Sequence, residues 1–107
     1  MPNNYKNALL DLTTTDATVL YTCPGATTAI FKSLSVCNDS AHNDTITVTI
    51  TDADSNVFSV YSVKAISGPS TEELVTNAFV VEENQIVKVT AATANRLHVV
   101  ASLLEIN

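Results

Sequence analysis

The sequence of 107 residues has few of the residues that mark several familiar protein classes. It contains two glycines and three prolines, too few for a collagen-like or linker-like chain. It contains no tryptophan and three tyrosines, which weakens the case for a sugar-binding platform of exposed aromatic rings. Hydrophobic residues nevertheless make up 46% of the chain, so disorder over its whole length is not expected.

Positive charge is also scarce. The formal net charge is −6, and the five Lys and Arg residues are scattered along the chain. They cannot form the basic stripe that phosphate neutralisation requires, so neither nucleic acid nor an anionic membrane surface is an expected partner. The apolar runs are far shorter than the ~20 residues that span a bilayer. Residues 1–6 lack the basic and apolar regions of a signal peptide. We therefore expect a protein that works where it is made, or leaves within an assembly or by cell lysis.

The strongest pattern that is present has a period of two. Residues Thr45–Thr51 alternate threonine with Ile46, Val48 and Ile50. Successive side chains of a strand point to opposite faces, so the three aliphatic residues are predicted to face a core and the four threonines to face water.

Similar runs recur at spacings near ten residues, separated by turn-forming residues, which favours a sandwich or barrel over alternating strands and helices. We predict an all-β fold with an antiparallel two-sheet β-sandwich, jelly-roll or immunoglobulin-like, of about eight strands. A short arm (1–6) would precede a single domain (7–107). A helical turn over Thr71–Ala78 is the main local alternative. The final strand is the most apolar and is expected to lie centrally. The predicted strands are Ala8–Leu12, Thr18–Cys23, Ala29–Cys37, Thr45–Thr51, Val57–Lys64, Glu72–Asn77, Gln85–Thr90 and Arg96–Ile106.

The two cysteines are predicted to be free thiols. If the strands ending at Cys23 and Cys37 form a hairpin, the two residues lie at opposite ends of it. Seven or eight residues at ~3.3 Å each would separate them along the sheet. A disulfide requires Cα atoms within about 7 Å. Free, partly buried thiols fit a reducing compartment of origin.

Catalytic and metal-binding motifs are incomplete. Asp52-x-Asp54-x-Asn56 has the opening spacing of a calcium loop, but Val57 and Val63 stand where such a loop needs glycine and glutamate, so a polar hairpin turn is favoured. His98 is predicted to be half-buried and hydrogen-bonded, on the strand face that carries Val100, Leu104 and Ile106. The adjacent pairs Glu72-Glu73 and Glu82-Glu83 are interpreted as solvated charges. We predict no enzyme activity and no cofactor or metal.

Several segments, in a fixed order, carry a resemblance to a known family. They are Asn7–Leu12, Leu20–Pro24, Thr28–Ile30, Val36–Asn38, Asp44–Thr51, Val80–Asn84, Val87–Ala91 and Leu103–Ile106. Together they resemble the small β-sandwich virion structural proteins of tailed bacteriophages, common in marine and cyanobacterial phages, over nearly the whole chain. Asn84 stands where the family usually has a turn glycine, and asparagine also tolerates a left-handed backbone.

The resemblance implies a virion protein made in the host cytoplasm. The first hypothesis is a capsid decoration (cement) protein, a homo-oligomer (dimer or trimer) that contacts the major capsid protein or other virion proteins. Asn4, Tyr5 and Lys6 are the predicted partner-binding residues, with Tyr5 as an amphipathic anchor; a frayed terminus is the alternative. A tail, collar or fibre adaptor or receptor-binding module is the second hypothesis, and a carbohydrate-binding module is the third.

Overall fold

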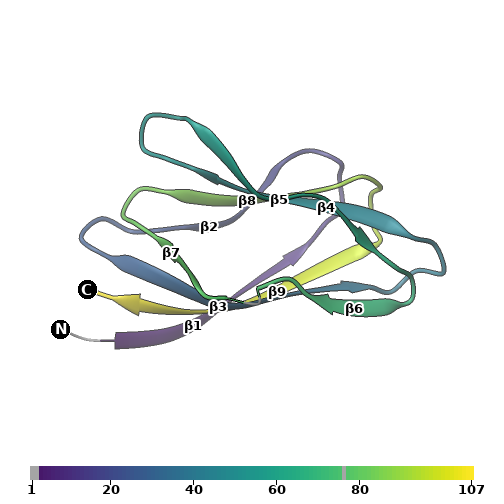
Figure 1. The fold of residues 1–107 in the computed structure, drawn as a ribbon, viewed down its shortest axis with the longest axis horizontal. Coiled ribbons are helices and arrows are strands. Elements are labelled where there is room, and N and C mark those ends of the chain that lie inside the picture. Colours follow the sequence, from purple (N-terminus) through teal and green to yellow (C-terminus); the bar gives the residue numbers. More distant parts are fainter. Residues whose placement is uncertain (1–2, 76) are drawn as a thin grey trace.

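The computed structural model describes residues 3–75 and 77–107, which form nine β-strands in two antiparallel sheets packed as a sandwich (Figure 1). The predicted all-β fold is confirmed. None of the described residues lies in a helix long and apolar enough to cross a membrane. The strands are β1 (Asn3–Asp11), β2 (Thr18–Thr22), β3 (Thr28–Asn38), β4 (Asp44–Thr51), β5 (Val57–Ile66), β6 (Ser70–Glu73), β7 (Phe79–Val81), β8 (Ile86–Ala91) and β9 (Leu97–Ile106).

The strands follow the path of a long antiparallel hairpin that is folded over into two sheets. One sheet has the order β1-β9-β3-β6, with β7 also paired to β3, and the other has the order β2-β8-β4-β5. The pairs are nested along the chain: β1 with β9, β2 with β8, β3 with β6 and β7, and β4 with β5. A nested antiparallel ribbon rolled into two sheets is the jelly-roll arrangement, one of the two topologies predicted. As expected, β9 lies inside its sheet, between β1 and β3.

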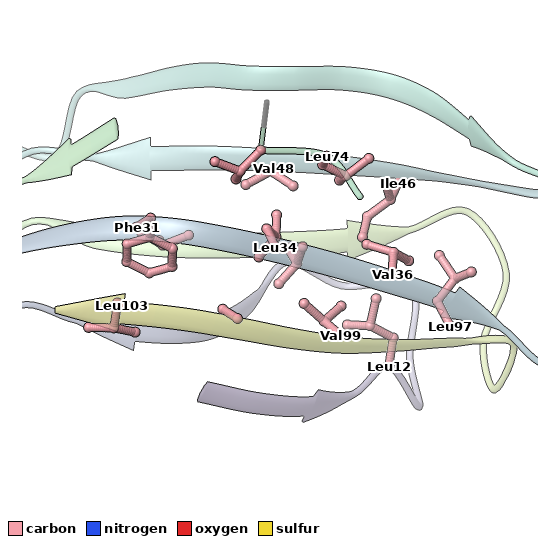
Figure 2. Close-up of a cluster of buried hydrophobic side chains, with 14 of the residues drawn as sticks. Leu12, Phe31, Leu34, Val36, Ile46, Val48, Leu74, Leu97, Val99 and Leu103 are labelled. Carbon is pink, nitrogen blue, oxygen red and sulfur yellow. The ribbon is translucent and has the colours of Figure 1, made fainter. Parts of the chain in front are cut away.

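The core lies between the two sheets. Side chains from β3, β4 and β9 gather there, among them Phe31, Val48 and Leu103 (Figure 2). Phe31 also stacks on Phe79, with ring centroids 5.0 Å apart. Burying aliphatic and aromatic side chains supplies most of the favourable free energy of such a sandwich. The largest fully buried side chains are Phe31, Leu12, Leu34, Ile46, Ile66, Leu97, Leu103, Val36, Val48, Val81, Val87 and Val89.

The threonine-rich strand β4 follows its predicted alternation except at its end. Ile46 and Val48 are fully buried, while Ile50 is only half-buried. Thr51, which was expected to face water, is 7% exposed, and its hydroxyl has no hydrogen-bond partner in the described part of the chain. Two register shifts between β4 and β5 interrupt the regular pairing, which a period-two pattern cannot anticipate.

The expected N-terminal arm is wrong for residues 3–6, and residues 1–2 lie outside the described residues. Asn3–Lys6 belong to β1 and pair with Leu103–Ile106 of β9. The segment Asn3-Asn-Tyr-Lys6 has no apolar alternation to mark it as a strand. It is ordered by the adjacent strand, whose backbone groups it satisfies.

The region around residues 70–81 differs from its prediction. The expected strand Glu72–Asn77 is replaced by the two short strands β6 and β7, and Thr76 lies outside the described residues. The alternative helical turn is wrong at Thr71–Glu73, which lie in β6. Glu73 accepts hydrogen bonds from the Ser33 hydroxyl and from the Leu34 N–H, the latter at 3.0 Å, which fixes β6 beside β3. The run Phe79–Val81 was too short to stand out as a strand.

Candidate partner-binding face

The three predicted partner-binding residues lie on β1 but not on one face. Tyr5 points outward and is 78% exposed, the largest exposed fraction among the large hydrophobic residues of the described chain. Asn4 and Lys6 lie opposite Glu105 and Leu103, on the inner side of the sheet. The Lys6 Nζ is 3.0 Å from Glu105 Oε1. Strand alternation therefore places Tyr5 on the opposite face of β1 from Asn4 and Lys6.

An apolar row crosses the outer face of the five-stranded sheet. Tyr5 of β1 pairs with Leu104 of β9, which pairs with Ile30 of β3, which pairs with Val80 of β7. Val80 is 53% exposed, and Ile30 and Leu104 are half-buried. Four adjacent strands thus contribute one apolar residue each, and we call Tyr5, Leu104, Ile30 and Val80 the apolar row. Contiguous exposed apolar residues of this kind often mark a binding surface.

Two further apolar residues, paired across β1 and β9, lie on the same outer face. Leu9 of β1 pairs with Val100 of β9, and their exposed fractions are 66% and 47%. Between this pair and the apolar row lie Asn7 and Ser102, also paired across the two strands. The outer face therefore alternates apolar and polar rows along the strands.

A shallow hollow adjoins the apolar row. It is lined by Tyr5, Lys6, Asn7, Lys32, Ser102 and Leu103. Two lysines therefore line this hollow, in a chain that carries a net charge of −6. Lys6 is paired with Glu105, and among the described residues no carboxylate lies within ion-pair distance of Lys32. The hollow offers one aromatic side chain, two small polar side chains and a cation to a ligand.

The other end of the same face carries His98 between two carboxylates. Its Nε2 is 3.3 Å from Asp11 Oδ1 and its Nδ1 is 3.7 Å from Asp39 Oδ2. Cys37 lies directly opposite His98 on β3. His98 shares its face with Val100, as predicted, but its side chain is 46% exposed. Both ring nitrogens of His98 therefore face carboxylates.

A buried carboxylate, Glu105, links the two sheets near the hollow. Glu105 is 4% exposed and accepts hydrogen bonds from the Tyr21 hydroxyl and from Lys6. The Tyr21 hydrogen bond, opposed by burial and aided by Lys6, holds the pKa of Glu105 below its usual range. Burial, with the hydrogen bond to Glu105, raises the pKa of Tyr21 well above that of a free tyrosine. At neutral pH, Tyr21 is therefore a neutral donor and Glu105 an ionised acceptor, and together they join β2 to β9.

Both cysteines are free, as predicted, but for a different reason. The expected hairpin does not form, because β2 and β3 belong to opposite sheets. Cys23 is buried, and its thiol donates to the Thr27 carbonyl at 3.3 Å. Burial raises the pKa of Cys23, so this thiol remains protonated at neutral pH.

The calcium-like segment forms the predicted polar hairpin turn between β4 and β5. Asp52 Oδ1 accepts the N–H groups of Asp54 and Asn56, each at 2.9 Å. The Asn56 N–H is the main reason that the pKa of Asp52 lies below its usual range. Over residues 3–75 and 77–107, no group of three or more His, Cys, Asp and Glu side chains is arranged to hold a metal ion.

Comparison with protein-family models, with curated proteins and with solved structures finds no match to this chain. The functional interpretation therefore depends on the surface described above. The sequence pattern did identify the face of β9 that carries Val100, Leu104 and Ile106. It did not show that this face is outward, nor that Tyr5, Ile30 and Val80 extend it across the sheet. Only the register of four strands brings those residues into line.

Proposed function

We propose that this protein is a non-enzymatic structural protein of a bacteriophage virion, a decoration protein that docks on the assembled capsid and bridges capsomers. The single observation that carries the proposal is the apolar row on the outer face of the five-stranded sheet. Two of its members, Tyr5 and Val80, are 78% and 53% exposed. A face of this composition is stabilised when a partner covers it.

The geometry suits docking on a formed shell. The apolar row is presented by four adjacent strands of one sheet, so its side chains are held in fixed positions before binding and little conformational entropy is lost. A protein that binds assembled capsomers better than separate ones stabilises the shell, by about 2.7 kcal/mol per site at a hundredfold excess over Kd. Jelly rolls also occur in viral capsid domains, which supports the proposal by analogy of fold only.

The first test is the composition of purified particles. Phage particles of the source virus are separated by gel electrophoresis, and the band of this protein is compared with that of the major capsid protein. Hundreds of copies per particle support a decoration protein. About a dozen copies or fewer would instead indicate the tail, collar or fibre location. Absence from mature particles contradicts both locations.

The second test asks whether the apolar row is the contact. Val80→Asp places a charge in the row, and Val57→Asp places one on β5 of the other sheet, where the valine is 63% exposed. We expect Val80→Asp to reduce the amount of protein that sediments with particles lacking it, and Val57→Asp to leave that amount unchanged. Equal loss in both variants contradicts docking through this row.

Carbohydrate binding is the second candidate, because Tyr5 stands beside Asn7, Ser102 and Lys32 at the hollow. An exposed aromatic ring flanked by polar side chains can stack on a sugar ring and hydrogen-bond its hydroxyls. A glycan array tests this candidate. Binding that is lost in Tyr5→Ala and kept in Val57→Ala supports it, and an array without signal contradicts it.

A further inference from the structure

The two sheets present edges on β1, β2, β5 and the short strands β6 and β7. A free edge exposes backbone N–H and C=O groups that can pair with another chain, and proteins usually blunt such edges by shortness, bulges or charge. The edges of this protein differ in how they are protected, and that difference identifies one of them as an interface.

All edges except β1 are protected. Strand β2 has five residues and a register shift between Val19 and Tyr21. Strands β6 and β7 have four and three residues. Strand β5 has two register shifts against β4, and Val63 within it has a left-handed backbone with φ of 52°. Irregular or short strands of this kind are poor templates for an added strand.

Strand β1 has none of these protections. Its nine residues pair with β9 in an unbroken register from Asn3 to Asp11. It contains no proline, and its only cation, Lys6, points to the inner side. A lysine that points inward from an edge strand discourages the addition of another strand, because the new strand would bury its charge without a partner. Here the charge is already paired with Glu105 of the same chain at 3.0 Å.

The free edge of β1 carries regularly spaced backbone groups. Leu12, which follows the strand, donates its N–H to the Leu97 carbonyl at 3.1 Å, so even-numbered residues bond toward β9. By the alternation of an antiparallel ladder, the N–H and C=O groups of the odd-numbered residues point to the open side. These odd-numbered residues include Tyr5 and Leu9, the two most exposed large hydrophobic residues of the described chain.

We propose that the free edge of β1 pairs antiparallel with β1 of a second copy of this chain, so that two five-stranded sheets join across a two-fold axis. The proposed register places Asn7 opposite Asn7 of the second copy. Tyr5 then lies opposite Leu9 of the second copy, and symmetry repeats this pair. Asn3 lies opposite Asp11, and Lys6 lies opposite the small Ala8.

Neighbouring registers are less favourable. Centring the pairing on Lys6 places two lysines directly opposite each other, and like charges in that position are destabilising. Centring it on Ala8 places Tyr5 opposite Asp11. A shift by a single residue places outward side chains opposite inward ones, which removes the match between the two faces. Only the register centred on Asn7 forms both Tyr5–Leu9 pairs without opposing like charges.

This dimer does not depend on the proposed virion function, because its evidence is the edge and not the apolar row as a whole. It would nevertheless place two apolar rows on one continuous face. A two-fold interface of this kind is self-complementary, as in most soluble homodimers. The added backbone ladder holds the strands together, and the two Tyr5–Leu9 pairs set their register.

The first experiment is sedimentation velocity over a range of protein concentrations. Wild-type protein is expected to form a dimer. Asn7→Pro removes an N–H from the open edge but none from the β1–β9 ladder, so we expect it to be a folded monomer. Asn7→Ser keeps the N–H and should remain a dimer. A wild-type monomer at all concentrations, or a dimer that survives Asn7→Pro, overturns the proposal.

The second experiment tests the register without proline. In a Cys37→Ser background, Asn7→Cys places two thiols opposite each other at the two-fold axis, where paired Cα atoms are about 5.5 Å apart. Mild oxidation should give a covalent dimer. Asn3→Cys is the matched control, because its copies lie far apart in this register. Equal cross-linking of both variants contradicts the proposed register, and no cross-linking of Asn7→Cys contradicts the interface.

The third experiment measures how much the two Tyr5–Leu9 contacts contribute to the affinity of the dimer. Leu9→Ala removes both symmetric Tyr5–Leu9 contacts and should weaken dimerisation by roughly threefold to thirtyfold. Val19→Ala is the control, because Val19 is exposed on β2, at another edge. An equal effect of the two substitutions contradicts the role of Leu9.

Discussion

The two ends of the sandwich are closed by different chemistry. At one end Asn38, the last residue of β3, is fully buried. At the other end Glu105 of β9 is 4% exposed. Both side chains reach from the five-stranded sheet to the four-stranded sheet. One does so as a neutral amide and the other as a charge, so the two ends are expected to respond differently to pH.

The Asn38 end is a network of neutral groups. Asn38 Nδ2 donates to the carbonyls of His42 and Ile66, at 2.8 and 3.1 Å. Its Oδ1 accepts from the N–H and the hydroxyl of Ser40, at 3.0 and 2.7 Å. All the hydrogen-bonding capacity of the amide is used, which compensates for its complete burial. None of these groups titrates near neutral pH.

The Glu105 end depends on a charge. The carboxylate is held by one tyrosine hydroxyl and one ammonium group, and the Lys6 side chain is itself 52% exposed. Protonation of the carboxylate would remove its attraction for Lys6. The two sheets are therefore joined by a pH-independent contact at one end and by an acid-sensitive contact at the other.

The largest loss in the free energy of unfolding is expected for Asn38→Ala. The change leaves the Ile66 and His42 carbonyls without their donor, and each unsatisfied buried group costs about 1–3 kcal/mol. We expect a loss of about 3 kcal/mol in the free energy of unfolding, measured by urea denaturation at pH 7. Asn3→Ala on the exposed part of β1 is the control. A loss below about 1 kcal/mol would show that this end is closed by apolar packing instead.

A smaller effect is expected for Gly68→Ala at the same end. A Cβ at this position would lie 2.4 Å from the His42 oxygen and 2.6 Å from the Ser40 oxygen, so the backbone must move. We expect a loss of about 2 kcal/mol. Gly25→Ala, in the turn after β2, would meet nothing closer than Glu83 Oε2 at 4.0 Å and should change stability by less than about 0.5 kcal/mol. Equal effects would contradict the difference in packing.

The stability change caused by Glu105→Gln should depend on pH, unlike the changes at the Asn38 end. The pKa of Glu105 is lowered in the folded protein, so its contribution is complete above the unfolded value of about 4.3 and is lost as the pH falls through the folded pKa. We expect the variant to lose about 1 kcal/mol at pH 7 and to equal wild type in strong acid. Urea denaturation from pH 7 to pH 2 measures this. Parallel pH curves for the two proteins would contradict the account.

The smallest effect is expected for Lys6→Met. Ion pairs with a half-exposed partner contribute about 0–1 kcal/mol, so the loss at pH 7 should be about 0.5 kcal/mol. Because Lys6 helps to lower the pKa of Glu105, the acid-induced loss of stability should begin at a higher pH than in wild type. Lys88→Met on the four-stranded sheet is the control, and it should leave the acid response unchanged.

Strand content and much of the core could be predicted from local pattern. The alternation in Thr45–Thr51 identified Ile46 and Val48 as core residues, and the apolar run ending at Ile106 was correctly placed inside a sheet. These predictions succeed because a half-buried strand repeats its environment every two residues. Asn84, which stands where the resembled family usually has a turn glycine, has a left-handed backbone with φ of 65°.

The pairing of strands, and the neighbours of each residue across a sheet, could not be predicted in the same way. The strand formed by Asn3–Lys6 has no apolar pattern, and the strands flanking Pro24 were expected to form a hairpin although they belong to opposite sheets. The candidate binding face also could not be predicted, because it depends on the register between strands. Tyr5 and Lys6 are neighbours in the chain, yet only Tyr5 faces outward, where its neighbours are Leu104 and, beyond it, Ile30.

The order of residues within each segment is enough to predict strands packed around an aliphatic core, because a period of two is a local property of the chain. Which strands pair, which sheet face is outward and which edge is left open are features of the folded molecule as a whole. Those features depend on register between segments up to about a hundred residues apart, such as Asn3 with Ile106. Register is chosen by the free energy of the whole packed molecule and not by any one segment.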